Sequence, residues 1–199
     1  MSLATEIRGE NRHSDRYIPA GVYQQIPFGD AYQRQHEFTA LWPRIVKPMS
    51  HFQVGNILEI GPGSGGETKA LQSFYPESQI TTVDIDERAE MAAEQNGVEV
   101  VSLDLAAAQT PKRIEKLVAN RGINTIVALR TSSAIVDNLL KWWDKSLGNK
   151  ILVFSLMWVS ESYELLEQIN QQAQKRGAQQ IHLANHGRLY DETVTALIH

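Results

Sequence analysis

Seven apolar runs rich in β-branched residues recur along the chain from residue 56 onward, and helical stretches separate the first six of them. The inner runs are apolar at consecutive positions, as strands of a parallel sheet covered on both faces require. This alternation predicts a doubly wound α/β domain. The expected strands are residues 56–61, 79–85, 98–103, 123–129, 150–158, 179–185 and 193–199.

Helix start and stop signals fall between these runs. Thr110 followed by Pro111 is typical of a helix start, and so is Ser160 followed by acidic residues. The apolar residues of one expected helix share a single face: Val136, Leu139, Leu140, Trp143 and Leu147. Four glycines stand where a left-handed residue lets the chain leave a helix before a strand: Gly97, Gly122, Gly148 and Gly177.

The end of the chain departs from this alternation. Only seven residues, 186–192, separate the sixth run from the seventh. A crossover helix needs a longer connection, so we expect the last two strands to form an antiparallel hairpin.

Composition limits the classes of protein that fit. A chain of 199 residues has the length of one ordinary domain, and 42% hydrophobic with 21% charged residues is typical of a soluble globular protein. A net charge of −4 argues against a nucleic acid as the main partner. The absence of cysteine excludes a thiolate nucleophile and fits a reducing cytoplasm. We therefore expect a cytoplasmic protein without a membrane span or signal peptide.

The segment 57–67, ILEIGPGSGGE, fits two glycine patterns at once. Gly61, Gly63 and Gly66 match the G-x-G-x-x-G turn of dinucleotide-binding proteins. Glu59 before Gly61, Gly63 and Gly65 matches the E-x-G-x-G-x-G turn of enzymes that bind S-adenosylmethionine. A carboxylate suits a cofactor with an ammonium and a sulfonium better than a pyrophosphate, which favours the second pattern. The alternative is that Glu59 only accepts hydrogen bonds from backbone N–H groups at the strand end.

Two further acids end the second and third expected strands. Asp84, followed by Ile85, lies 23 residues after Gly61, where an acid is expected to bind the hydroxyls of a ribose. Asp86 is expected to cap the next helix, and a pair of surface acids is the alternative. Asp104 ends the third strand and is followed by the apolar Leu105.

With these markers and the terminal hairpin, the chain resembles the class I S-adenosylmethionine-dependent methyltransferases. The resemblance implies a seven-stranded, mostly parallel sheet of order 3-2-1-4-5-7-6, with strand 7 antiparallel. It also implies that Asp104 accepts a hydrogen bond from the adenine amino group while Leu105 packs on the ring. The residues assigned to the cofactor are Glu59, Gly61, Pro62, Gly63, Ser64, Gly65, Asp84, Ile85, Asp104, Leu105 and Arg130.

The acceptor of the methyl group is less constrained. The segment after the fourth strand, ALRTSS, lacks the Asn-Pro-Pro-aromatic run typical of methylation of exocyclic amines of bases. Arg130 could bind an anionic substrate or pair with Asp137 or Glu59 instead. Residues 131–133 are expected to cap the next helix rather than to act in catalysis.

Residues 1–55 precede the cofactor-binding domain of residues 56–199. We expect a loop over residues 16–32 and an amphipathic helix over residues 31–46, which in this family commonly closes over the cofactor as a lid. The alternative is that the segment only docks on the sheet. The residues expected to contact substrate are Tyr17, Tyr23, His36 and Trp158, with Phe28 and Trp42 as further pocket candidates.

The sequence thus predicts S-adenosylmethionine-dependent methyl transfer to a small molecule, without a metal. It leaves the oligomeric state open, with a homodimer among the alternatives. RNA or protein as the acceptor, aminopropyl transfer and a non-catalytic nucleoside-binding protein stay open as alternatives. An NAD-dependent oxidoreductase is disfavoured because neither Tyr163 nor Tyr190 is followed by lysine four residues later.

Overall fold

A computed structural model describes residues 52–62, 65–85, 87–95, 97–105, 110–129, 131, 133–145, 150–157, 160–186 and 191–198. The described strands are β1 (Asn56–Ile60), β2 (Ile80–Asp84), β3 (Val100–Ser102), β4 (Ile123–Ala128), β5 (Ile151–Met157), β6 (Gln179–His186) and β7 (Asp191–Ile198). The described helices are α6 (Gly66–Phe74), α7 (Glu87–Gln95), α8 (Thr110–Arg121), α9 (Ser133–Lys145) and α10 (Ser160–Arg176).

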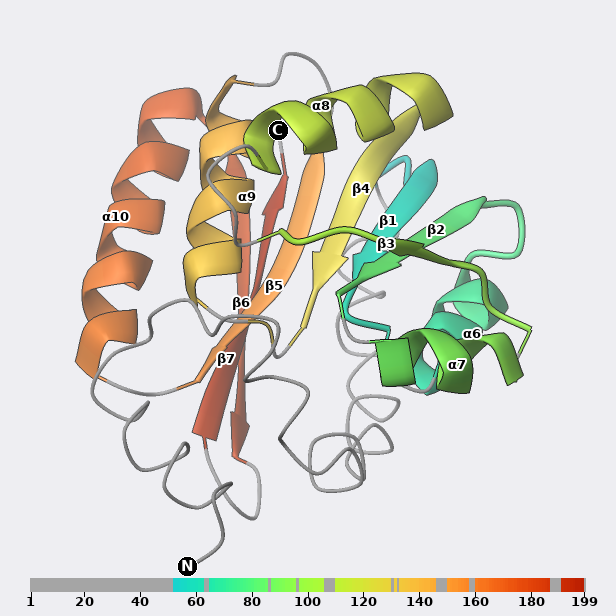
Figure 1. The fold of residues 1–199 in the computed structure, drawn as a ribbon. Coiled ribbons are helices and arrows are strands. Elements are labelled where there is room, and N and C mark those ends of the chain that lie inside the picture. The colour runs from blue at the N-terminus through green and yellow to red at the C-terminus, as the bar shows by residue number, and fades with distance from the viewer. Residues whose placement is uncertain are drawn as a thin grey trace, which may run out of the picture.

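All seven strands form one sheet, in the order β3-β2-β1-β4-β5-β7-β6 (Figure 1). Every neighbouring pair from β3 to β5 is parallel, whereas β7 is antiparallel to both β5 and β6. The predicted fold class and strand order are therefore confirmed. The chain reverses its direction of winding between β1 and β4, which is where ligands bind in open α/β sheets.

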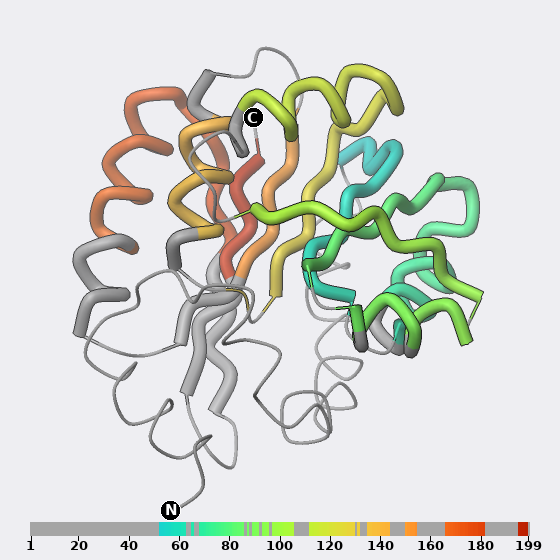
Figure 2. Tube along the Cα trace, viewed as in Figure 1, coloured from blue at the N-terminus to red at the C-terminus, as the bar shows by residue number. Residues whose placement is uncertain are grey.

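Alternate residues of β1 face opposite layers of helices. Leu58 and Ile60 belong to the core cluster built with α8, α9 and α10. Ile57 belongs to the cluster on the other face, together with Ala70 and Leu71 of α6. Figures 1 and 2 show α9 and α10 side by side over the half of the sheet that contains β5. Both faces of the central strands are thus covered, which explains their continuous apolar sequence.

The predicted helix ends are confirmed where the structure describes them. Gly97, Gly122 and Gly177 each have a positive φ, of 74°, 58° and 65°. Gly148 lies outside the described residues.

The hairpin between β6 and β7 is tighter than predicted. His186 pairs with Asp191, and Asn185 pairs with Glu192, so both strands continue into the segment expected to be a loop. The prediction of a seven-residue connection was therefore wrong. The expected strands ended where the apolar runs end, but a backbone ladder between two antiparallel strands forms regardless of the polarity of the side chains.

Candidate functional site

The carboxyl ends of β1, β2, β3 and β4 lie next to one another at one edge of the sheet. Ile60 of β1 pairs with Val83 of β2, and Asp84 of β2 pairs with Ser102 of β3. On the other side, Glu59 of β1 pairs with Val127 of β4. The residues that follow these strands are therefore brought together across the switch point of the fold.

The glycine turn joins β1 to α6 with two residues in the left-handed region. Gly61 has φ 73°, and Gly65 has φ 79°. The turn is closed by a hydrogen bond of 2.8 Å from Gly65 N to Pro62 O, and Gly61 N donates to Val83 O at 2.9 Å. Glycine adopts this conformation without steric cost and leaves the backbone accessible to a ligand. Gly63 and Ser64 lie outside the described residues.

Glu59 is a buried carboxylate, with 1% of its surface exposed, on the strand that leads into this turn. The hydroxyl of Thr68, on α6, donates a hydrogen bond to its Oε2 atom. Thr68 is equally buried. The contact joins the strand before the turn to the helix after it, and sequence reasoning did not identify Thr68. The role of Glu59 toward a cofactor stays a prediction.

Asp84 is the last residue of β2 and is half-buried. Its Oδ1 accepts a hydrogen bond of 2.7 Å from the N–H of Ile85, which fixes the side chain at the strand end. The backbone carbonyl of Asp84 accepts a bond of 2.9 Å from Leu103 N and thereby ties β2 to the segment after β3. Asp84 therefore lies between the glycine turn and Asp104. Asp86 lies outside the described residues.

Asp104 and Leu105 follow β3, and their positions differ in burial. Asp104 is half-buried, whereas Leu105 has only 4% of its surface exposed. Asn138, on α9, donates a hydrogen bond of 3.1 Å from Nδ2 to the carbonyl of Leu105. This bond fixes a loop residue to a helix 33 residues away in sequence. Asn138 is a second residue of this edge that sequence reasoning missed.

Thr131, three residues after β4, has an unexpected environment. Its Oγ1 atom is buried and makes no hydrogen bond with any part of the chain that the structure describes. Thr131 therefore does not supply the cap expected from residues 131–133, because capping requires a bond to a backbone N–H. The side chains of Ser132 and Ser133 lie outside the described residues, so the cap itself stays a prediction. A buried hydroxyl without a partner costs about 1–3 kcal/mol. Thr131 thus calls for an explanation other than helix capping.

Thr131 also adjoins the glycine turn. A Cβ built on Gly61 would lie 3.9 Å from Cγ2 of Thr131. Gly61 and Thr131 therefore lie beside each other after the ends of β1 and β4, with the Thr131 methyl at van der Waals distance from the position of a Cβ on Gly61. A side chain at position 61 would point into the same space.

The remaining predicted site residues lie outside the described part of the chain. They are Arg130 after β4, Trp158 after β5, and Tyr17, Tyr23, Phe28, His36 and Trp42 of the N-terminal segment. Their assignments stay predictions. Within the described ranges, no group of three or more His, Asp or Glu side chains lies close enough to hold a metal ion.

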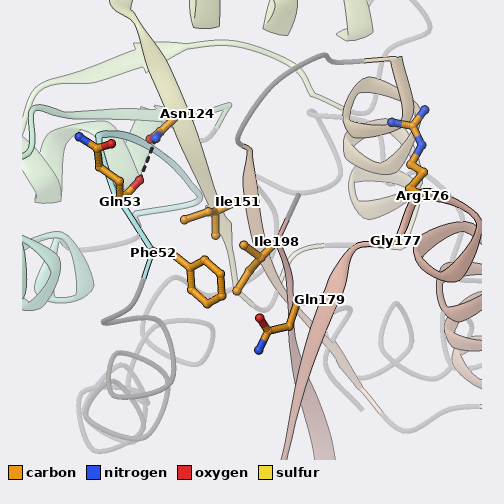
Figure 3. Close-up of a pocket in the computed structure, with 8 residues that line it drawn as sticks. All are labelled: Phe52, Gln53, Asn124, Ile151, Arg176, Gly177, Gln179 and Ile198. Atoms are coloured by element: carbon orange, nitrogen blue, oxygen red, sulfur yellow. Dashed lines mark hydrogen bonds between the residues drawn. The ribbon is translucent and has the colours of Figure 1, made fainter.

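A hollow of about 410 Å³ lies at the opposite edge of the sheet (Figure 3). Its floor is formed by Phe52, Ile151 and Ile198, and Asn124, Gln53 and Gln179 contribute amide groups. Figure 3 shows the guanidinium of Arg176 directed away from this floor. That guanidinium donates to Trp143 O at 3.3 Å and lies 5.4 Å from the centre of the Trp143 ring.

The amide of Asn124, one of the polar groups that line this hollow, is bonded to the chain itself. Asn124 accepts a hydrogen bond of 2.9 Å from Gly55 N and donates one of 3.0 Å to Gln53 O. The amide of Asn124 therefore holds the segment before β1 against β4. We regard this hollow as a structural feature rather than a ligand site.

The carboxyl edge, by contrast, suits an elongated ligand that carries a nucleoside. It offers a turn without Cβ atoms at Gly61, a fixed carboxylate at Asp84 and a second carboxylate at Asp104. Two carboxylates fit the hydroxyl and amino donors of a nucleoside. A buried carboxylate at Glu59 beside the turn disfavours a pyrophosphate there. The residues present thus fit S-adenosylmethionine better than a dinucleotide.

Comparisons with known proteins support the assignment of the fold. No protein-family model matches the sequence, and no curated protein matches it. The methyltransferase domain of bacterial CtHen1 matches with TM-score 0.56 at 13% identity, over 81% of this chain and 98% of that chain. Precorrin-6y C5,15-methyltransferase from Geobacter metallireducens matches with TM-score 0.52 at 12% identity, over 74% and 81%.

A third match is the Dnmt2 methyltransferase of S. pombe, with TM-score 0.55 at 14% identity, over 72% of this chain and 49% of that chain. At such low identities these similarities show the fold and leave the chemistry open. The chain has the Rossmann-like fold of class I methyltransferases, as its motifs predicted. Among the described residues, no helix has the length and apolarity needed to cross a membrane.

Proposed function

We propose that the protein is an S-adenosylmethionine-dependent methyltransferase. The observation that carries the proposal is the order of groups along one edge of the sheet. Asp104 follows β3, Asp84 ends β2, and the glycine turn follows β1, on three adjacent strands. This order matches the order of adenine, ribose and amino acid in the cofactor.

Each part of the cofactor has a set of residues suited to it. Leu105 and Asp104 would hold the adenine, the first by apolar contact and the second by accepting from the amino group. Asp84 would accept hydrogen bonds from the ribose hydroxyls. The turn from Gly61 to Gly65 would hold the amino-acid part, with Glu59 supporting the turn through α6. These residues bind and orient the cofactor without acting on bonds themselves.

When bound, the cofactor supplies a methyl group already activated by its sulfonium. The chain then has to align an acceptor with that methyl and to exclude water. A general base is needed only for an acceptor that is protonated at working pH. We propose a small-molecule acceptor, contacted by the N-terminal segment of residues 1–55 as a lid and by Trp158. Arg130 would contact the cofactor or an anionic group of the acceptor.

Calorimetry separates this proposal from its main rival. We expect the purified protein to bind S-adenosylhomocysteine, the product form of the cofactor, at micromolar concentrations and to show no binding of NAD. Binding of NAD without binding of S-adenosylhomocysteine would overturn the proposal. Mass spectrometry of any small molecule that co-purifies would test the same point independently.

Deletion of residues 1–30 tests the proposed lid. We expect the truncated protein to bind the cofactor as before but to lose turnover with a small-molecule acceptor, since the acceptor site would be incomplete. A screen of carboxylate, phenol and amine acceptors with labelled cofactor would supply the assay. Unchanged turnover after truncation would refute the lid.

A further inference from the structure

The hydroxyl of Thr131 is a buried polar group without a hydrogen bond among the described residues. A folded protein retains such a group at a cost in stability, and a ligand that bonds to it can remove the cost. The same edge of the sheet bears the features proposed to bind the cofactor. The position of Thr131 decides which part of the cofactor it can reach.

Thr131 lies at the end of the row of strands that begins with β3. The parts assigned to adenine and ribose lie at β3 and β2, and Thr131 follows β4, beyond the glycine turn of β1. Neighbouring strands are about 4.8 Å apart, so β4 is roughly 10 Å from β2. The methyl of Thr131 faces Gly61, at 3.9 Å from the position of a Cβ there. With adenine and ribose assigned to β3 and β2, the amino-acid end of the cofactor is the part that would lie nearest Gly61 and Thr131.

We infer that the Thr131 hydroxyl binds the amino-acid end of S-adenosylmethionine. The inference rests on the proposed function. A hydroxyl both donates and accepts, so it can bond to the carboxylate or to the ammonium of that group. The sulfonium offers neither a donor nor a lone pair free to accept strongly. The bond that the hydroxyl lacks in the ligand-free chain is then made by the cofactor.

Thr131→Val tests the inference because valine keeps the shape and removes only the hydroxyl. We expect the ligand-free variant to melt about 2–4 °C higher, since a buried group without a partner is removed. We expect its affinity for S-adenosylhomocysteine to fall about tenfold, from the loss of one hydrogen bond to a charged group. Thr131→Ser keeps the hydroxyl and should bind within about threefold of the native chain.

The site of contact is tested with a shorter ligand. Methylthioadenosine has the adenine, ribose and sulfur of the cofactor but lacks its amino-acid end. We expect Thr131→Val to bind methylthioadenosine as the native chain does, because the lost bond is not made by that ligand. An equal loss of affinity for both ligands would overturn the inference, since the substitution would then act on the binding of the adenosine part.

Tyr75 provides a matched control at the other edge of the sheet. Its hydroxyl is also buried without a hydrogen bond among the described residues, and it packs in the cluster with Phe52, Val54 and Ile80. Tyr75→Phe should leave the affinity for both ligands unchanged. A parallel loss of affinity in Tyr75→Phe would show that removing any buried hydroxyl weakens binding, and would overturn the inference.

Two further results distinguish the inference from the function on which it rests. If the native chain binds S-adenosylhomocysteine and Thr131→Val binds it equally well, the inference fails while the proposed function stands. A lower melting temperature for ligand-free Thr131→Val would show that the hydroxyl has a structural partner, and would also overturn the inference. If the native chain binds neither ligand, the proposed function itself is wrong.

Discussion

The two edges of the sheet differ in the groups that they present. At the amino edge, Asn124 bonds to Gly55 and Gln53, and Arg176 bonds to Trp143. At the carboxyl edge, the hydroxyl of Thr131 is buried without a bond among the described residues, and Gly61 holds a left-handed turn. At the first edge the amide of Asn124 and the guanidinium of Arg176 are bonded to the chain, and the buried hydroxyl of Tyr75 lies in an apolar cluster. The second edge presents the hydroxyl of Thr131 beside a glycine turn.

This difference teaches that a hollow is not in itself a sign of binding. The cavity of about 410 Å³ lies at the amino edge, away from the glycine turn. What distinguishes the carboxyl edge is the chemistry of its groups and their order across neighbouring strands. Substitutions at matched positions of the two edges should therefore affect different properties, affinity at one edge and stability at the other.

The largest effect on affinity is expected at Asp84. Asp84→Ala removes the group that would accept hydrogen bonds from two ribose hydroxyls. Its affinity for S-adenosylhomocysteine, measured by calorimetry, should be about 100-fold lower than that of the native chain. Asp137→Ala is the control, because Asp137 is an exposed acid on α9 that pairs with Lys141 at 2.5 Å. Such a surface pair contributes little, so its loss should leave affinity unchanged. Equal binding by Asp84→Ala and the native chain would remove Asp84 from the site.

Two glycines give a direct comparison of the edges. Gly61→Ala forces a residue with a Cβ into φ 73° and places a methyl beside Thr131. We therefore expect the affinity for the cofactor to fall by about tenfold or more. The free energy of unfolding should fall by about 1–2 kcal/mol. Gly55→Ala would place its Cβ 2.9 Å from Asn124 Oδ1. It should destabilise the fold by about 1–3 kcal/mol without changing affinity.

Urea unfolding and calorimetry on both glycine variants would measure the two properties separately. A loss of affinity in folded Gly55→Ala comparable to that in Gly61→Ala would contradict the division between the edges.

A smaller effect is expected at Asn138, which holds the carbonyl of Leu105. Asn138→Ala frees the segment that is proposed to contact adenine, so S-adenosylhomocysteine should bind about three- to tenfold more weakly. Asn120→Ala, at an exposed position of α8, is the matched control. Calorimetry with adenosine and with S-adenosylhomocysteine should give the same ratio of dissociation constants, variant over native chain, for both ligands. A ratio near one for adenosine would place Asn138 outside the adenine contact.

The smallest effect concerns the pH dependence of stability at the amino edge. Burial raises the pKa of Tyr75 from 10.0 to about 12. The unfolded chain therefore loses this proton at a lower pH than the folded chain, and the stability from the neutral phenol is lost as pH rises from 10 to about 12. Tyr75→Phe should show a shallower fall in its urea midpoint over that range. Identical pH profiles would contradict the burial of this hydroxyl.

Much of the fold could be predicted because its signals are local. The β-branched runs mark the strands, and the glycines at 97, 122 and 177 end helices through a conformation that side chains rarely adopt. The hairpin was misjudged because His186 and Asp191 are polar, although their backbones pair. Polarity is a weak guide to where an antiparallel ladder stops.

The candidate site was predicted less completely, for a physical reason. Gly61, Asp84 and Asp104 follow a spacing that one strand and one helix impose, so a single sequence reveals them. Thr68, Asn138 and Thr131 become relevant only through contacts made in the folded chain, such as the bond from Asn138 to Leu105. No local pattern marks such residues in advance.

The assignment of ligand binding to the carboxyl edge is tested most directly by NMR titration of the full chain with S-adenosylhomocysteine. We expect the amide signals of Gly61, Ile85, Leu105 and Thr131 to shift with a common dissociation constant, while those of Gly55 and Asn124 stay in place. Shifts confined to Gly55, Asn124 and their neighbours, or none at any of these residues, would contradict that assignment.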